Sequence, residues 1–417
     1  VNLATLDINY NKLSSLNVTG LSSLKTLNAH NNKLTSIALT GLTSLTSLEV
    51  SSNLLTTLDA SPAINLTYIS AGYNRLSSAS LTGLSSLTSL SIGRNRMTSL
   101  SLSTLSSLTY LDAANNMLTS LDATAAPELT NMQVSYNKLA SLKLTGLSSL
   151  NTLNAQNNNL TTLSLTGLSG LRDISINNNK LTKLDLSPAT ALTDVGLRNN
   201  RLTTLSLTNL SNLRSLNAGN NRLAKIDVTK NALLIALNID RNNIKALNLS
   251  SVPSLEFLNV SSNLMTKLDV SKTSNLTTLS ANENKLTVIN LKSNRVLESL
   301  SLNSNPISKV DVSGLGQLEW LYLNNTKVSQ LQLSKNSSLY SLALAGTNVT
   351  NLNLSKNLLL SGLDIRKTRL RNLDLRLINL GSLDARGSKV RVLVKDPSSA
   401  RLDWQTTLDS GVVLASK

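Results

Sequence analysis

Cysteine is absent from the sequence, so the fold cannot rely on disulfides or on thiolate-bound metals. Aromatic residues amount to 2%, and His30 is the single histidine. No apolar run reaches the ~18 to 20 residues that a membrane-spanning helix requires. These absences exclude a core of ordinary composition and leave no candidate membrane span. Aliphatic side chains, above all leucine, must supply the burial.

Positive charge is in excess but unevenly distributed, with a net charge of +16 over 417 residues. Residues 1–210 carry 13 Lys and Arg against 9 Asp and Glu, whereas residues 211–417 carry 26 against 14. A basic excess favours acidic partners in general, such as polyanionic glycans, anionic surfaces or nucleic acid. The second half of the chain is therefore the better candidate for an electrostatic contact.

A repeat of 21 residues runs through the sequence from Ala4 onward, in the form xxLxaxxNxLxxLxLsxLxxL. The period holds without a gap to residue 360, the next window (361–380) is one residue short, and a further window begins at Gly381. This spacing is typical of leucine-rich repeats. We expect residues 1–395 to form one solenoid of about 19 turns that starts mid-repeat, and residues 396–417, with Trp404, to form a cap or tail.

The first half of each window alternates apolar and polar residues, as in Thr26-Leu27-Asn28-Ala29-His30. This period of two predicts a strand whose leucine and alanine face inward, and stacked repeats then give a parallel β-sheet on the concave face. The second half also spaces its apolar residues two apart and is rich in Thr, Ser and Gly, which predicts a mostly extended or turn-like convex side with little helix. A helix is ~10 Å wide and strands repeat every ~4.8 Å, so extended backs predict low curvature.

Two positions of the window carry further information. The inward fifth position alternates large and small residues over nine turns: Ile8, Ala29, Val50, Ala71, Ile92, Ala113, Val134, Ala155 and Ile176. Inward side chains on adjacent strands lie ~4.8 Å apart, so small residues leave room for their β-branched neighbours. The eighth position holds Asn from Asn11 to Asn305 and then Thr326, Thr347, Thr368 and Ser388. We expect this row to satisfy backbone groups where the chain leaves the strand, more weakly where the residue is Thr or Ser.

The later turns, of the form LTxLdvSxNxxLxxL, resemble the 21-residue repeats of internalin-type bacterial surface proteins. One subgroup of these proteins carries a cysteine ladder at the fifth position, where this chain has residues such as Ala218, Ile239, Val260 and Ala281. The resemblance covers the whole array. It implies a related solenoid, a role in recognition or adhesion, and an extracellular or cell-surface location.

Catalytic and metal-binding patterns are absent, which predicts that the chain is neither an enzyme nor the holder of a cofactor. Asp173 and Asp194 occupy the same position of neighbouring turns and could seat a cation or act as a carboxylate pair. The flanking Arg172 and Arg198 favour a surface ion-pair cluster instead.

Aromatic residues fall outside the predicted core and instead lie on or beside the strand face. Exposed rings among Asn, Ser and Asp suit either sugar stacking or protein hot spots, because both need apolar area with hydrogen bonds nearby. Packing against neighbouring strands is the alternative. The candidate partner-binding residues of this kind are Tyr68, Tyr110, Phe257, Trp320 and Tyr322.

A dense group of basic residues near the end of the array is the best candidate for an electrostatic contact. Its predicted partner-binding members are Arg366, Lys367, Arg369, Arg371 and Arg386. The pairs Asp364/Arg366 and Asp384/Arg386 also predict a ladder of solvated salt bridges on adjacent strands. A sparser basic row at the ninth position could follow a polyanion, but a solubilising edge explains it more simply.

Two functions remain open at this point. The first is a non-catalytic recognition or adhesion module that binds a protein or glycan ligand, which could be anionic, through its strand face. The second is a structural subunit that associates end to end through the open ends of the solenoid, giving a filament or surface layer. Nucleic acid is not favoured as a partner.

Overall fold

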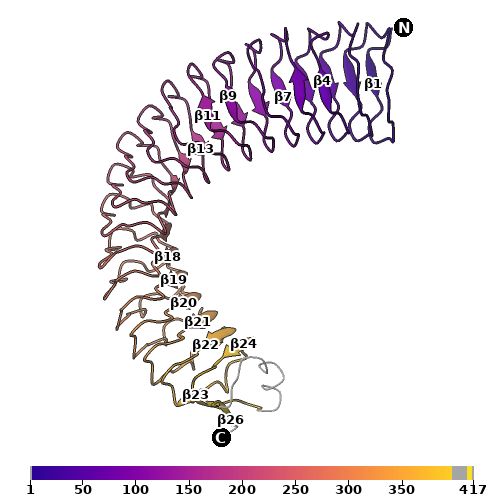
Figure 1. The fold of residues 1–417 in the computed structure, drawn as a ribbon. Coiled ribbons are helices and arrows are strands. Elements are labelled where there is room, and N and C mark those ends of the chain that lie inside the picture. Colours follow the sequence, from indigo (N-terminus) through magenta and orange to yellow (C-terminus); the bar gives the residue numbers. More distant parts are fainter. Residues whose placement is uncertain (1, 397–410, 416–417) are drawn as a thin grey trace. The chain divides into compact units, whose positions relative to one another are not determined.

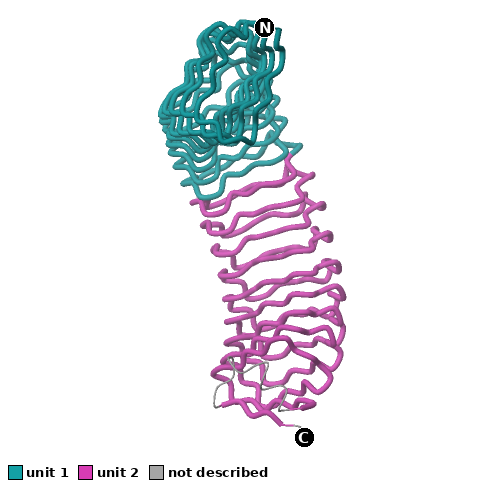
Figure 2. Tube along the Cα trace, turned by 90° about the vertical axis from the view of Figure 1, so that its right-hand side faces the viewer, with its two compact units in different colours: residues 1–212 teal, residues 213–417 magenta. Residues whose placement is uncertain are grey.

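The structure is a computed structural model that describes residues 2–396 and 411–415. The chain divides into two compact units, residues 1–212 and 213–417, which are treated separately below (Figure 2). In each unit the backbone winds turn after turn and places a three-residue strand once per turn (Figure 1). The described residues contain no helix, and hence none that could cross a membrane.

The first unit carries a parallel sheet whose strands recur every 21 residues. Its strands are β1 (Thr5–Asp7), β2 (Thr26–Asn28), β3 (Ser47–Glu49), β5 (Tyr68–Ser70), β7 (Ser89–Ser91), β8 (Tyr110–Asp112), β10 (Asn131–Gln133), β12 (Thr152–Asn154), β13 (Asp173–Ser175) and β14 (Asp194–Gly196). The opposite side of the turns is extended, and in places it forms further parallel pairs, β4 (Thr57–Asp59) with β6 (Ser78–Ser80) and β9 (Ser120–Asp122) with β11 (Ser141–Lys143).

The second unit repeats this arrangement. Its once-per-turn strands are β15 (Ser215–Asn217), β16 (Ala236–Asn238), β17 (Phe257–Asn259), β18 (Thr278–Ser280), β19 (Ser299–Ser301), β20 (Trp320–Tyr322), β21 (Ser341–Ala343), β22 (Gly362–Asp364) and β24 (Ser382–Asp384). On the other side lie β23 (Asn372–Asp374), β25 (Arg391–Leu393) and β26 (Val413–Ala415), paired in parallel in that order. The predicted leucine-rich repeat solenoid, with a parallel sheet and an extended opposite side, is confirmed.

The predicted C-terminal cap is described only in part. Strand β26 adds to the edge of β25, and the Val394 N–H donates to the Ala415 carbonyl over 2.9 Å. Trp404 lies outside the described residues. A cap formed by residues 396–417 therefore stays a prediction.

Aliphatic side chains fill the interior of each unit, as the alternation predicted. Leu27 is buried between the half-buried Thr26 and Asn28 of the same strand. At the fifth position both the small Ala113 and the larger Ile92 are completely buried. Each fully buried leucine contributes roughly 1.5–3 kcal/mol, so the repeated row supplies the burial that aromatic residues provide in ordinary cores.

The eighth-position asparagines join neighbouring turns. The Asn53 Nδ2 donates to the carbonyls of Ala29 (2.9 Å) and Val50 (3.1 Å), and its Oδ1 accepts from the Leu34 N–H (2.9 Å). One amide thus satisfies groups on its own turn and on the turn before. By contrast, the Thr326 hydroxyl donates to Leu323 of its own turn over 2.7 Å. The Ser388 hydroxyl, however, donates to the Ile365 carbonyl of the preceding turn (2.6 Å) and accepts from the Thr368 N–H (3.0 Å). That the Thr and Ser positions give a weaker ladder stays a prediction.

A second row of buried asparagines lies on the opposite side of the second unit, at the eighteenth position. The Asn336 Nδ2 donates to the carbonyls of Val312 (2.9 Å) and Leu315 (2.7 Å) of the preceding turn. Its side-chain oxygen is buried without a hydrogen-bond partner, as is that of Asn357. Each such asparagine therefore donates two hydrogen bonds and leaves one buried acceptor unsatisfied. The unsatisfied acceptor offsets part of the stability that the two hydrogen bonds contribute.

Replacing a ladder asparagine should destabilise the fold. Asn95→Ala removes donors to Ala71 and Ile92 and the acceptor for the Leu76 N–H. Because buried backbone groups then lack partners, we expect a loss of about 1–3 kcal/mol in chemical unfolding. Asn95→Thr should lose less stability than Asn95→Ala. Equal midpoints for Asn95→Ala and the exposed control Ser85→Ala would contradict this assignment.

Enlarging a small fifth-position residue should also destabilise the fold. Ala113 lies one turn from Ile92 and one turn from Val134, so Ala113→Ile places three β-branched side chains in succession. Overpacking of this kind costs about 1–3 kcal/mol. Thermal unfolding followed by circular dichroism measures the change, with the exposed Ala140→Ile as the control. An unchanged midpoint for Ala113→Ile would show that the alternation has no packing role.

Candidate recognition sites on the strand face

We use "strand face" for the outward side of the once-per-turn strands. In the second unit it presents Phe257, Trp320 and Tyr322, here named the aromatic patch. Phe257 is 37% exposed, and Trp320 and Tyr322 are half-buried, so the prediction that these rings lie outside the core is confirmed. The strand register places Phe257 and Trp320 in one row, three strands or ~14 Å apart.

Small side chains surround the aromatic patch. Thr278 and Ser299 lie between Phe257 and Trp320 in the row, and Ser301 and Ala343 flank Tyr322. These neighbours are too small to enclose the rings, which therefore keep apolar area accessible beside hydroxyl groups. Such a surface combines the two features that protein hot spots use.

Three glutamates border the aromatic patch at the starts of the turns, and sequence reasoning missed them. Glu256 and Glu298 are exposed, and Glu319 is half-buried. The Glu298 carbonyl accepts from the N–H groups of Glu319 and Trp320, which fixes the two glutamates on adjacent turns. Among the described residues none of the three forms an ion pair. The sequence does distinguish these glutamates, because most earlier turns have Thr or Asn at this first position of the window.

In the first unit, Tyr68 and Tyr110 stand at the starts of β5 and β8 with Ser89 between them. They are 37% and 36% exposed. Burial raises the pKa of Tyr110, and the nearby carboxylate of Asp112 adds to this effect. Both tyrosines thus lie outside the core, as predicted.

Beyond these strands the first unit has a pocket of about 230 Å³. Its lining includes Gly72, Gly93, Ser91, Asp112 and Arg94. The Arg94 guanidinium stands 4.8 Å from the ring centre of Tyr73. Sequence reasoning did not identify this site, although two consecutive turns with Gly at the sixth position marked it.

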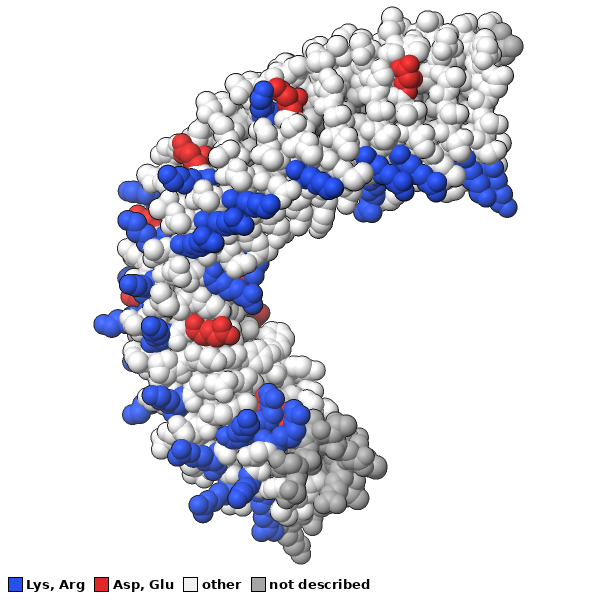
Figure 3. Space-filling model, viewed as in Figure 1, with Lys and Arg blue, Asp and Glu red and all other residues white. Residues whose placement is uncertain are grey.

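The basic cluster of the second unit contains the predicted salt-bridge ladder. The Arg366 guanidinium bridges Asp364 (2.7 Å) and Asp384 (3.3 Å), and Arg386 pairs with Asp384 (2.6 Å). Two of the five predicted contact residues are therefore ion-paired, while Lys367, Arg369 and Arg371 are exposed. In Figure 3 basic side chains outnumber acidic ones on the visible face of this unit.

The two acids flagged as a possible cation seat are register partners on β13 and β14. Burial raises the pKa of Asp173, and the charge of Asp194 and a hydrogen bond with it act in the same direction, against Arg172. Asp173 is therefore protonated more readily than an isolated aspartate side chain is. Within the described residues no group of three His, Cys, Asp or Glu side chains could hold a metal ion.

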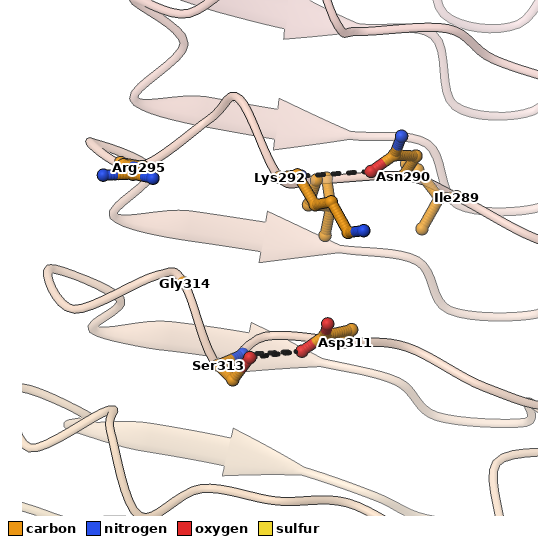
Figure 4. Close-up of a pocket in the computed structure, with 8 residues that line it drawn as sticks. Ile289, Asn290, Lys292, Arg295, Asp311, Ser313 and Gly314 are labelled. Carbon is orange, nitrogen blue, oxygen red and sulfur yellow. Dashed lines mark hydrogen bonds between the residues drawn. The ribbon is translucent and has the colours of Figure 1, made fainter.

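A cleft of about 550 Å³ opens on the opposite side of the second unit (Figure 4). Lys292 and Arg295 line it, but its carboxylate is already engaged: the Asp311 Oδ1 accepts from the Ser313 hydroxyl (2.6 Å) and N–H (3.0 Å). These hydrogen bonds lower the pKa of Asp311. The Asn290 side chain likewise accepts from the Lys292 N–H. The carboxylate and the amide oxygen that line the cleft thus accept hydrogen bonds from residues of their own turns.

The once-per-turn parallel strands, the aliphatic interior and the asparagine ladder define a leucine-rich repeat protein, and its architecture resembles that of internalin-type proteins. The functional domain of InlJ from Listeria monocytogenes, described as including a cysteine ladder, is 29% identical with a TM-score of 0.64, over 75% of this chain and 66% of that one. YopM from Yersinia pestis is 29% identical with a TM-score of 0.63, over 77% and 88%.

The plant peptide hormone receptor RGFR1, in complex with RGF2, shares the fold with a TM-score of 0.74 at 22% identity, over 95% of this chain and 68% of that one. No protein-family model matches the chain, and a comparison with curated protein sequences finds no match. The likeness to RGFR1 is one of fold.

Asp374 and Arg376, which form an ion pair of 2.7 Å on the opposite side of the second unit, should be detectable by titration. Hydrogen bonds from the Arg376 side chain and backbone lower the pKa of Asp374 from 3.8 to about 2. A lowered folded-state pKa stabilises the fold above pH ~4, and this contribution is lost as the pH falls toward 2. NMR titration of the carboxyl carbon should give a midpoint near 2, rising in Arg376→Gln. A midpoint near 3.8 in the unmodified chain would contradict the pairing.

Proposed function

We propose that the chain is a non-catalytic recognition module that binds a partner protein through the strand face of its second unit, outside the cell or at a cell surface. The observation that carries the proposal is the aromatic patch: three rings held on rigid strands among small polar side chains. Protein interfaces concentrate their binding energy in a few such residues, Trp and Tyr above all.

The strand face suits a protein ligand for two further reasons. Its backbone is fixed by pairing on both sides, so little conformational entropy is lost when a partner binds. The rings are also bordered by charge, since Glu256, Glu298 and Glu319 stand at the starts of their turns. Charge beside a contact surface orients a partner and excludes wrong ones.

The comparisons support the class of partner and the location. The receptor RGFR1 shares the fold and was solved in complex with RGF2. The proposed surface location rests on the resemblance of the repeats to those of internalin-type bacterial surface proteins, and the likeness to the InlJ domain is in line with that resemblance. Adhesion as the biological role is part of the same proposal, and the partner's identity is for experiment to find.

Alanine substitutions in the aromatic patch test the proposal. A random peptide library displayed on phage, selected on the full chain, supplies defined ligands for titration. Trp320→Ala should weaken their binding by about 30-fold or more, as expected for a hot spot of ≥ 2 kcal/mol, and Phe257→Ala should weaken it to a smaller degree. Tyr136→Ala, an exposed tyrosine of the first unit, is the matched control.

The same titration can refute the assignment. If the selected peptides bind Trp320→Ala and Phe257→Ala as tightly as they bind the unmodified chain, the aromatic patch is not the contact surface. Circular dichroism on each variant separates loss of contact from loss of fold.

A further inference from the structure

Two glycines line the pocket of the first unit. Gly72 and Gly93 occupy the sixth position of consecutive turns, where the flanking turns have Ser51 and Ala114. Neither glycine has the positive φ that would require this residue type. Space is the constraint instead: a Cβ on Gly93 would lie 2.9 Å from the Asp112 carboxylate oxygens, and one on Gly72 would lie 3.2 Å from the Gly93 carbonyl.

The walls of the pocket supply hydrogen-bonding groups of both kinds. Ser70 and Ser91 contribute hydroxyls, which both donate and accept. The Asp112 Oδ1 accepts from the Ala114 N–H over 3.0 Å, and its Oδ2 lies 3.5 Å from the Ser91 hydroxyl. This carboxylate therefore keeps acceptor capacity on the side that faces the pocket.

A backbone feature that recurs in each turn positions Tyr73 and Arg94 beside the pocket. The residue before each ladder asparagine has a left-handed backbone, with φ of 54° at Tyr73 and 56° at Arg94. This geometry brings the two side chains together, so that the guanidinium of Arg94 stands against the Tyr73 ring. Arg94 and Asp112 therefore line the same small pocket.

The charges of the walls select the ligand. A basic group in the pocket would meet Arg94, and an acidic group would meet Asp112. A neutral group with several hydroxyls can donate to the carboxylate and accept from the guanidinium and the serines. The volume of about 230 Å³ equals that of roughly eight water molecules at ~30 Å³ each, which suits one compact ring.

We propose that this pocket binds a single neutral hexose residue of a glycan. The exposed faces of Tyr68 and Tyr110, which begin strands that also line the pocket, offer stacking area for the adjoining sugars. The site lies wholly in the first unit, so it does not depend on the aromatic patch of the second.

The experiment uses the full chain on an array of glycans with neutral terminal and internal hexoses, followed by titration of each glycan that binds. Gly93→Ser adds a side chain against the Asp112 carboxylate and uses a residue that other turns carry at this position, such as Ser51 and Ser135. Asp112→Asn removes the charge but keeps the local turn, because Asn28 and Asn154 accept the same backbone hydrogen bond in their turns.

Each of these two variants should weaken binding of the neutral glycan at least tenfold. Gly316→Ser, where an added side chain meets open space, should leave it unchanged, as should Trp320→Ala. Circular dichroism and the thermal midpoint confirm folding. Competition by unlabelled hexose should displace the glycan.

Three results would overturn the proposal. The first is that no neutral glycan binds the unmodified chain. The second is that the bound glycan has the same affinity for Gly93→Ser and Asp112→Asn. The third is that peptides carrying Asn or Gln bind in a manner sensitive to Gly93→Ser while sugars do not, which would assign the pocket to a protein side chain.

Discussion

Stacking of one turn on the next is the constraint on which the rest of this structure depends. A three-residue strand has no stability of its own, and its backbone groups are satisfied only by the strands one turn away. The ladder amides reinforce this pairing at the end of each strand, as Asn53 does between its own turn and the preceding one. Aliphatic burial supplies the favourable free energy of folding, and hydrogen bonding between turns determines how one turn stacks on the next.

The same constraint explains where functional residues can lie. Inward positions are taken by leucine and by the alternating fifth-position residues, so rings and charges can occur only on the outside. Many outward groups are also committed to structure: Asp112 and Asp364 accept backbone N–H groups two residues on, and Asp311 does the same on the opposite side. The groups most available to a partner are the aromatic patch, its glutamates and the pocket at Gly72 and Gly93, where Asp112 keeps acceptor capacity beside its backbone hydrogen bond.

The regular part of this architecture could be predicted from the sequence because it is encoded within a single window. Leucine spacing gave the strand and its inward face, and the alternation of Ala29 and Val50 gave the packing between turns. The pocket and the glutamate row were missed because their meaning depends on neighbours 21 residues away. Gly93 looks like an ordinary turn residue unless it is known that Gly72 and Asp112 lie beside it. Glu298 likewise looks like an ordinary surface charge unless it is known that Glu319 lies on the next turn. The left-handed backbone at Tyr73 and Arg94 was missed as well, since neither residue type signals it.

Removal of one whole turn tests most directly whether the turns share a continuous interior. A chain lacking residues 130–150 loses a complete window and brings Leu129 to Asn151 in register. Hydrogen exchange should show the strand amides on both sides of the junction protected, with cooperative unfolding retained. A chain lacking residues 130–140 cuts the turn in half and should lose protection around the junction. If both deletions gave the same protection, or if the whole-turn deletion failed to fold, the turn would not be the unit from which this protein is built.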